Sequence, residues 1–479
     1  MSDIGYYFST LIGPLFFYGP FVAAVLLGLT LPIIVIALSS TSAKFLDHQK
    51  LVVIFAGIVL GSTLATAFSG RLIISDAELA SNPSLLATAR QEGNAWFSRI
   101  AHLVVLAVSI SEIFLWFLQK RRMGNLQFKL WLAAMAYYTF SIVVSGILGE
   151  FRGLDLKVLY MPMVLTAVAL LAPSNYKQAL NALRFILFIP LVGSLVAIWI
   201  APTLVMETGY QSLIPGFSIR LAGLTEHANS LGVIAAIAIF LELSRYVRAK
   251  PNIFFLAIAS LNLVLAQSKT AWGIAIICLA LLGLGVASVG RNKRGSTVDL
   301  KLAVFVSFSV ALAIAFVFFK IDALQNYLGD DRTGLSTFTG RTKIWSITWD
   351  EFVSNPLTGY GPALWDQTYR FQRGMMAVGQ AHNQYMQTLG QAGILGIGSL
   401  AIYICLLLSR GVSNWAETGG LSLVLVLVVL IRGLSESPMR MLGIMDFDSF
   451  THLLAFTTAA AVTCAARPKG TVLAGKALA

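Results

Sequence analysis

Apolar runs long enough to cross a lipid bilayer recur along almost the whole chain, and no other feature limits its fold as strongly. A membrane-spanning helix needs roughly 17–25 mostly apolar residues, at about 1.5 Å of rise per residue. The 479 residues are 57% hydrophobic and only 12% charged, with a mean hydropathy of +0.78. Ordinary soluble domains carry about 25% charged residues. The sequence therefore predicts an all-α polytopic membrane protein.

The spacing of these runs predicts about 12–13 transmembrane helices within a single integral-membrane domain, residues 1–479. Residues 9–41 contain Pro14 and Pro20, so they form either one kinked span or an interfacial segment followed by a span. The other expected spans are 50–69, 99–118, 127–147, 157–172, 179–201, 228–244, 252–267, 270–289, 300–320, 384–409, 416–434 and 448–466.

The distribution of charge predicts which connections share a side of the membrane. Lys and Arg are retained preferentially in short cytoplasmic loops. Every second connection is almost purely basic, from Lys44 and Lys50 to the C-terminal tail with Arg467 and Lys469. The others are longer and balanced in charge: 70–98, 148–156, 202–227, 321–383 and 435–447. We therefore expect a cytoplasmic C-terminus, extracytoplasmic long loops, and a net charge of +12 that reflects orientation rather than nucleic-acid binding.

The large loop at residues 321–383 holds the densest collection of polar and aromatic side chains. Within it, Trp345, Trp349 and Phe352 recur at spacings of four and three residues, which predicts an amphipathic helix lying on the membrane surface. Asn355-Pro356 should end this helix, and Gly359-Tyr360-Gly361-Pro362 predicts a turn. Residues 83–98 are a second candidate for a short amphipathic helix.

His382 lies at the end of this loop, just before the apolar helix expected from Gln384. Backbone N–H groups and the dipole at a helix N-terminus favour a neutral imidazole, which can accept a proton. Such a histidine at the membrane boundary is a candidate general base for an alcohol. The alternative is that His382 only caps the helix.

Two cations are predicted on the same side of the membrane as His382. Arg220 precedes the span at 228, and Lys269 lies in a tight connection between two apolar helices. A cation so close to hydrocarbon is costly unless an anion compensates it. A phosphate group would do so, because arginine grips two oxygens and lysine acts as a point charge. Snorkelling to the interface is the alternative.

Several polar residues and glycines between residues 390 and 448 can be interpreted either as structural or as functional. Arg432 and Glu436 are one helical turn apart, so a structural i,i+4 ion pair is the default. Asp446 and Asp448 form an acidic pair of the kind that holds a divalent metal in many transferases, but we favour Asp448 as the cap of the last helix. The glycines at 390, 393, 396 and 398 favour tight helix packing over a groove for a lipid chain.

Several functional classes have no motif in the chain. A Walker A loop, a His-Glu-x-x-His zinc motif and a Cys-x-x-Cys pair are all missing from the sequence. ATP-driven transport, zinc hydrolysis and thiol redox chemistry are therefore unsupported, and we expect no cofactor and no bound metal.

Four short motifs together resemble the O-antigen ligase and O-antigen polymerase superfamily. His382-Asn383, followed by Gly393 and Gly396, resembles its histidine motif, and Arg220-x-x-x-Leu224 resembles its arginine motif. The exopolysaccharide-polymerase members have signatures similar to three further stretches: Gly340-Arg341-Thr342-x-Ile344-Trp345, Pro356-Leu357-x-Gly359-Tyr360-Gly361 and Arg432-x-x-x-Glu436-Ser437. The resemblance runs from about residue 220 to residue 437.

The resemblance implies an inverting, metal-independent glycosyltransferase of the bacterial inner membrane with its active site facing the periplasm. An acceptor hydroxyl would attack the anomeric carbon of an undecaprenyl-pyrophosphate-linked glycan, and the lipid pyrophosphate would leave. His382 matches the essential histidine, as base or acceptor-orienting group, and Arg220 matches the arginine that holds pyrophosphate. Lys269 stands where many members have arginine. The expected substrate-binding residues are Lys269, Arg341, Asn383, Arg432 and Glu436.

Three functions remain open from the sequence. A polymerase would use another lipid-linked repeat unit as acceptor, whereas an O-antigen ligase would use lipid A–core. The exopolysaccharide-type loop motif favours the polymerase. A lipid-glycan transporter or flippase is the alternative from another class. Transporters centre their sites near the bilayer midplane, whereas the polar groups here collect at one predicted membrane face. The expected partners are the lipid-linked glycan, its acceptor and membrane lipids.

Overall fold

The computed structural model describes residues 44–73, 95–172, 176–210, 218–244, 246–247, 250–291, 338–376 and 378–461. This part of the chain is mostly helical and contains one two-stranded antiparallel sheet, β1 (Met206–Thr208) with β2 (Ile219–Leu221). Five of its helices are long and apolar enough to cross a membrane. The predicted all-α polytopic membrane fold is confirmed.

The predicted spans coincide with helices wherever the structure describes them. The five long helical segments are α3 (Asp47–Ala67), α6 (Ala95–Leu118), the run of α7 (Asn125–Tyr138), η2 (Thr139–Val144) and α8 (Ser145–Leu148), α10 (Tyr176–Ile200), and α18 (Gln384–Ser413). Shorter apolar helices are η3 (Leu156–Leu159) with α9 (Tyr160–Leu171), α12 (Ala228–Leu243), α13 (Ile253–Leu265), α14 (Lys269–Arg291), α20 (Leu421–Arg432) and α21 (Phe447–Ala460). The predicted spans at 9–41 and 300–320 lie outside the described residues.

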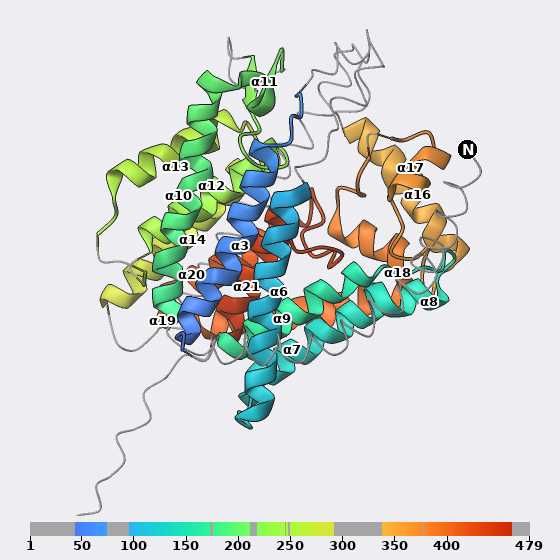
Figure 1. Cartoon of the computed structure of the whole chain (residues 1–479), viewed down its shortest axis with the longest axis horizontal. Helices are drawn as coiled ribbons and strands as arrows, with labels where there is room; N and C mark the ends of the chain where they lie inside the picture. Colours follow the sequence, from blue (N-terminus) through green and yellow to red (C-terminus); the bar gives the residue numbers. More distant parts are fainter. Residues whose placement is uncertain are drawn as a thin grey trace, which may run out of the picture.

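Ion pairs between helix ends fix the direction in which the helices run. Lys50 near the start of α3 lies 2.6 Å from Glu112 near the end of α6, and Arg184 near the start of α10 lies 3.0 Å from Glu242 at the end of α12. Helices α3, α6 and α10 lie side by side (Figure 1). The ends that the charge pattern assigned to one side of the membrane therefore lie together, and the opposite ends carry the long connections.

Helix α12 is the central helix of the bundle, because it is buried along nearly its whole length and packs against α10, α13 and α14. Helices α20 and α21 are also largely buried and pack against each other. The first turn of α12, the end of α20 and the start of α21 meet at the same end of the bundle. Side chains from three distant parts of the sequence are thus brought together there.

Helix α18 is interrupted at Gly393, whose φ of 59° and ψ of −153° are not helical. The loop after α16 (Phe338–Ser354) provides a hydrogen-bond acceptor for a backbone group at this break. The backbone N–H of Ile394 donates to Pro356 O at 2.8 Å. A Cβ at Gly390 would lie 2.4 Å from Cγ2 of Thr348 in α16. The glycines at 390 and 393 therefore allow tight packing, as we favoured from the sequence.

Replacing Gly393 by alanine is expected to lower the free energy of unfolding by about 2–4 kcal/mol. The side chain would be forced into a left-handed backbone conformation and also into a close contact with a neighbouring atom. A Cβ there would lie 2.4 Å from Pro356 O. Chemical denaturation in detergent measures the change. Gly398→Ala is the matched control, since a Cβ at Gly398 meets no atom within 4 Å. Equal stabilities of the two variants would contradict the prediction.

The loop before His382 folds on α18 as a small unit with its own apolar cluster. It contains α16 and α17 (Gln367–Gln372), and its buried side chains include Ile344, Trp365 and Tyr369 (Figure 1). Helix α16 begins and ends close to the predicted limits, and Trp349 on its outer face is 49% exposed. In the other candidate amphipathic segment, residues 95–98 belong to α6, and 83–94 lie outside the described residues.

Candidate functional site

A chain of three side-chain hydrogen bonds joins His382 to Arg220. Nδ1 of His382 lies 2.9 Å from Oε2 of Glu436. Nδ2 of Asn229 donates to Oε1 of the same carboxylate at 2.7 Å, and Nη2 of Arg220 donates to Oδ1 of Asn229 at 2.9 Å. The structure therefore brings the two predicted catalytic residues to one site, although 162 positions separate them in the sequence.

His382 lies directly before the N-cap residue of α18 and does not cap that helix. His382 has a φ of 49°, an uncommon left-handed conformation for a residue other than glycine. Asn383 is the N-cap of α18, and its Oδ1 accepts from the N–H groups of Tyr385 and Met386 at 2.9 and 3.0 Å. The alternative that His382 only caps the helix is wrong, because the neighbouring asparagine performs that role.

Glu436 is a buried carboxylate on which three donors converge. Besides His382 and Asn229, Gln380 donates its Nε2 to Oε2 at 2.6 Å, and the side chain is only 1% exposed. Burial alone would raise the pKa of Glu436, but the hydrogen bond and charge of His382 hold it well below its usual range. A charged carboxylate at Nδ1 fixes the ring orientation and leaves Nε2 as the open nitrogen of His382, whose side chain is 30% exposed.

Arg220 is held on the short sheet with its guanidinium over an aromatic ring. It is paired in register with Glu207, and its Nη1 lies 3.8 Å from that carboxylate. The guanidinium carbon lies 4.7 Å from the ring centroid of Tyr210, and Nε donates to Ala266 O at 3.4 Å. Sheet, ring and carbonyl together fix the position of a partly exposed cation.

Lys269 and Arg341 approach this region from two other elements. Lys269 begins α14, three residues after the Ala266 carbonyl that Arg220 contacts. Arg341 lies on α16 one turn before Trp345, whose indole N–H donates to Ala381 O at 2.9 Å, next to His382. Both side chains are partly exposed, and neither has a hydrogen bond or ion pair within the part of the chain that the structure describes.

Arg432 lies beneath the site. Its side chain is buried, forms an ion pair with Asp448, and donates to Asn229 O at 3.0 Å and to Oγ of Ser230 at 3.1 Å. The expected i,i+4 pair with Glu436 is therefore wrong, because Arg432 is directed at the buried first turn of α12. These bonds hold Asn229 in place between Arg220 and Glu436.

The cap of the last helix also differs from the prediction. Asp446, not Asp448, is the N-cap of α21, and its carboxylate accepts from the backbone N–H of Ser449. Asp448 lies within the first turn, where Arg432 neutralises it. Within the described residues, no group of three or more His, Cys, Asp or Glu side chains is arranged to hold a metal ion.

Arg71 organises the loop between Arg220 and α12, and we did not single it out from the sequence. Its guanidinium donates to four backbone carbonyls, of Leu204 at 3.0 Å, Gly223 at 2.6 Å, Thr225 at 2.7 Å and Glu226 at 2.9 Å. Burial lowers the pKa of Arg71 to about 10, so it remains charged at neutral pH. A lone arginine directly after a span was the signal in the sequence, but its partners were not visible there.

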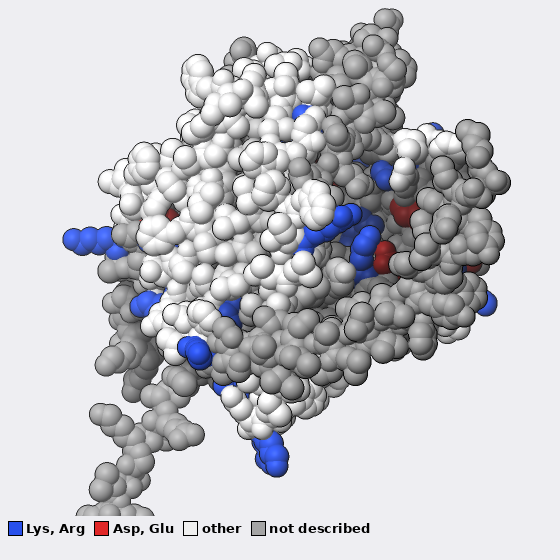
Figure 2. Space-filling view, in the orientation of Figure 1, with Lys and Arg blue, Asp and Glu red and all other residues white. Residues whose placement is uncertain are grey.

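His227 is a second imidazole at the site. It is the N-cap residue of α12, its side chain makes no capping bond, and it is exposed. Desolvation by the surrounding protein lowers the pKa of His227, while the charge of Glu436 opposes this shift, so the two groups share one electrostatic environment. Figure 2 shows a hollow between the surfaces over α6 and α16 in which basic and acidic side chains gather.

Comparison with known proteins gives one family match. Residues 254–401 match the family model described as O-antigen ligase. The matched segment includes Lys269, Arg341, His382 and Asn383, whereas Arg220, Arg432 and Glu436 lie outside it. No curated protein matches the sequence.

Proposed function

We propose that this chain, a member of the O-antigen ligase and O-antigen polymerase superfamily, transfers glycan from undecaprenyl pyrophosphate to an acceptor hydroxyl. The family supports a glycosyltransferase acting on glycan and lipid-linked substrates. The observation that carries the finer proposal is the hydrogen-bonded chain from His382 through Glu436 and Asn229 to Arg220. This connection between a base and a cation supports the proposal that the two act on the two sides of one sugar–phosphate bond.

In the proposed reaction, Nε2 of His382 accepts the proton of the acceptor hydroxyl as the oxygen attacks the anomeric carbon. The bond from that carbon to the pyrophosphate oxygen breaks, and the oxygen keeps the electron pair. Attack opposite the leaving group inverts the anomeric configuration. The carboxylate of Glu436, 2.9 Å from Nδ1, stabilises the imidazolium that forms.

Cations stabilise the leaving pyrophosphate in this proposal. Arg220 is fixed by Asn229 and Tyr210, so its charge needs no reorganisation during the reaction. Lys269 adds a point charge on the same side. A preorganised electrostatic donor of this kind typically contributes about 10²–10³ in rate. Fixed cations thus supply the charge stabilisation that a divalent metal would otherwise provide, and we propose a metal-independent reaction.

We propose a polysaccharide polymerase of the bacterial inner membrane as the specific function. The exopolysaccharide-type loop motif favours a lipid-linked repeat unit as the acceptor, whereas the description of the matched family favours an O-antigen ligase that uses lipid A–core. We propose that the site faces the periplasm and that the C-terminus is cytoplasmic, an orientation that the alternation of basic connections supports. Because the polar groups gather at one end of the bundle, they suit transfer at a membrane face better than transport through the midplane.

A reconstituted assay tests the reaction, its metal requirement and its acceptor. Purified protein in EDTA is expected to elongate lipid-pyrophosphate-linked repeat units at a rate within about twofold of that with Mg²⁺, because cations of the chain stabilise the leaving group. Gel separation of labelled glycan measures the product. Activity only after metal addition would contradict metal independence, and transfer only to lipid A–core would identify a ligase. Movement of intact lipid-linked glycan across the bilayer without transfer would identify a flippase.

A further inference from the structure

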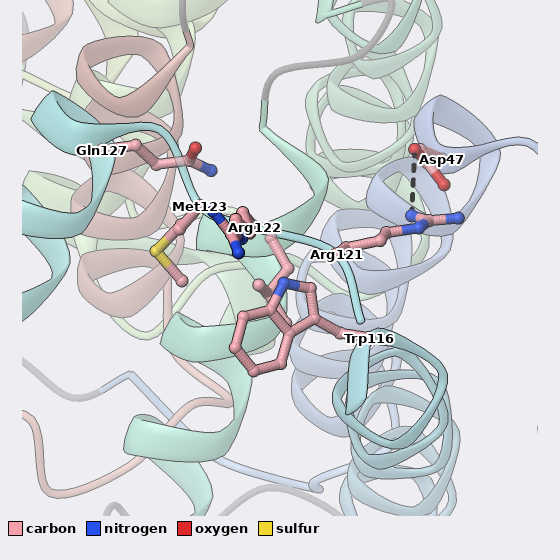
Figure 3. A pocket seen from close by; sticks show the side chains of 7 residues that line it. Asp47, Trp116, Arg121, Arg122, Met123 and Gln127 are labelled. Atoms are coloured by element: carbon pink, nitrogen blue, oxygen red, sulfur yellow. Dashed lines mark ion pairs between the residues drawn. The ribbon is translucent and has the colours of Figure 1, made fainter. Parts of the chain in front are cut away.

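A second polar pocket lies at the opposite end of the bundle from His382. Its volume is about 330 Å³, and its lining residues are Asp47, Trp116, Arg121, Arg122, Met123, Gln127 and Leu170 (Figure 3). They come from the ends of α3, α6, α7 and α9 and from the connection between α6 and α7. Helix α3 has 21 residues, so its two ends lie about 30 Å apart, the thickness of the bilayer core. The far end of α3 leads to Arg71, which holds the loop beside Arg220.

The charges around this pocket leave an excess cation. Arg121 lies 3.7 Å from Asp47 and 3.4 Å from Glu112, and Lys50 lies 2.6 Å from Glu112. These two cations and two carboxylates balance each other. Arg122 is exposed and has no ion pair among the residues that the structure describes. Figure 3 shows its guanidinium between Met123 and Trp116, while Arg121 turns toward Asp47.

The start of α7 adds to the attraction for an anion. Gly124 is its N-cap residue, and Gln127 in the first turn accepts from the Gly124 N–H at 3.2 Å. The side-chain amide of Gln127 is held by the Ala169 carbonyl of α9, which fixes this wall of the pocket. A helix N-terminus carries a partial positive charge of roughly +0.5. The dipole of α7 and the charge of Arg122 therefore favour the same kind of ligand.

Exposed apolar side chains flank the same three helix ends. Phe117 and Leu118 end α6, Leu126 and Phe128 begin α7, and Phe45 and Leu46 precede α3, with exposures from 43% to 67%. A soluble phosphate compound would leave these apolar side chains uncovered. An amphiphile fits both features, because its acyl chains cover apolar side chains while its phosphate enters the charged pocket. Basic pockets at helix ends are recognised sites for anionic lipid headgroups.

We propose that this pocket binds the phosphate of an anionic glycerophospholipid from the adjacent leaflet. Arg122 and the N-terminus of α7 hold the phosphate oxygens, and the indole of Trp116 packs beside the headgroup. The lipid thereby links the ends of α3, α6, α7 and α9. The site is independent of the proposed transferase chemistry, since it lies at the other membrane face.

Native mass spectrometry of the full-length protein with added lipid tests the site. The wild type is expected to bind phosphatidylglycerol about tenfold more tightly than phosphatidylcholine, and Arg122→Gln should weaken phosphatidylglycerol binding about five- to tenfold. Lys120→Gln is the matched control, because Lys120 is exposed, lies two positions away and does not line the pocket. Its expected loss is less than about twofold. Trp116→Leu should weaken binding without a change in charge.

Three results would overturn the proposal. Equal losses in Arg122→Gln and Lys120→Gln would mean that only the general surface charge attracts the lipid. Equal affinity for phosphatidylcholine and phosphatidylglycerol would mean that the pocket does not select lipids with a net negative charge. Displacement of phosphatidylglycerol by an equal concentration of inorganic phosphate would assign the pocket to a soluble anion. An unfolding temperature raised by phosphatidylglycerol in the wild type but not in Arg122→Gln would support the lipid site.

Discussion

Replacing His382 by alanine is expected to lower the rate of glycan transfer by roughly 10²–10⁴-fold, the contribution typical of a positioned general base. The imidazole is 30% exposed and keeps Nε2 open, while Nδ1 is held by Glu436 at 2.9 Å. Alanine removes the imidazole that we propose accepts the proton of the acceptor hydroxyl. We expect KM for the lipid-linked donor to change far less than kcat, since the cations that hold pyrophosphate remain. Steady-state kinetics in proteoliposomes measures both.

Two further variants separate the loss of the base from other effects. His382→Asn keeps a residue that tolerates the left-handed backbone at φ 49°, so equal losses in both variants would exclude backbone strain as the cause. His227→Ala removes the neighbouring imidazole at the N-terminus of α12 and is expected to cost less than about tenfold. A fully active His382→Ala, or a larger loss in His227→Ala, would contradict the assignment.

The helices of the described chain could be predicted from the sequence because their signals are local. Apolar runs of bilayer length predicted the spans, and the spacing of Trp345, Trp349 and Phe352 predicted α16 close to its observed limits. The alternation of basic connections predicted which helix ends lie together, and thus that His382 and Arg220 share one end. Each of these predictions depends on residues within one segment or on a rule applied to every loop.

The partners of the polar side chains could not be predicted in this way. An i,i+4 pair contributes only about 0.2–0.5 kcal/mol, so the buried position of Arg432 against Asp448 and Ser230 outweighed its sequence proximity to Glu436. Arg71 contacts carbonyls 133 to 155 positions away. Such pairings are decided by how α12, α20 and α21 pack, and no local pattern encodes that packing.

The hydrogen-bonded core of the site was likewise only partly visible in the sequence. His382, Arg220 and Glu436 were all singled out, but Asn229, which joins Arg220 to Glu436, was not assigned a role. An asparagine in the first turn of a helix is usually interpreted as a local capping residue. Its side chain instead bridges two charged groups from other elements, which only the three-dimensional arrangement reveals.

Replacing Glu436 by glutamine is expected to lower kcat by roughly 10²–10⁴-fold, in line with the loss of the carboxylate partner of a catalytic histidine. Three donors, from His382, Asn229 and Gln380, point at the two carboxylate oxygens. An amide has one acceptor oxygen and one NH₂ group, so at least one of these donors would face another donor. The His382 ring would then lose its orientation or its tautomer, and no negative charge would remain to stabilise the imidazolium.

The pH dependence of stability provides an independent measurement on the same residue. The pKa of Glu436 lies well below its ordinary value of 4.5 in the folded protein. Its stabilising contribution is therefore fully present above pH 4.5 and is lost only as the pH falls through the lower folded value. We expect the wild type to exceed Glu436→Gln in unfolding free energy by about 1–3 kcal/mol. This difference should shrink as the pH falls below 4.5.

Glu351→Gln is the matched control for this substitution. Glu351 is also a buried carboxylate, paired with Arg373 and accepting from the hydroxyl of Tyr369 at 2.6 Å, but it belongs to the cluster of α16 and α17. Glu351→Gln should therefore lower stability to a similar extent while kcat stays within about tenfold of the wild type. Equal losses of kcat in the two variants would mean that Glu436 acts only through the fold. A selective loss in Glu436→Gln, partly recovered in Glu436→Asp, would assign the carboxylate to the orientation and charge stabilisation of His382.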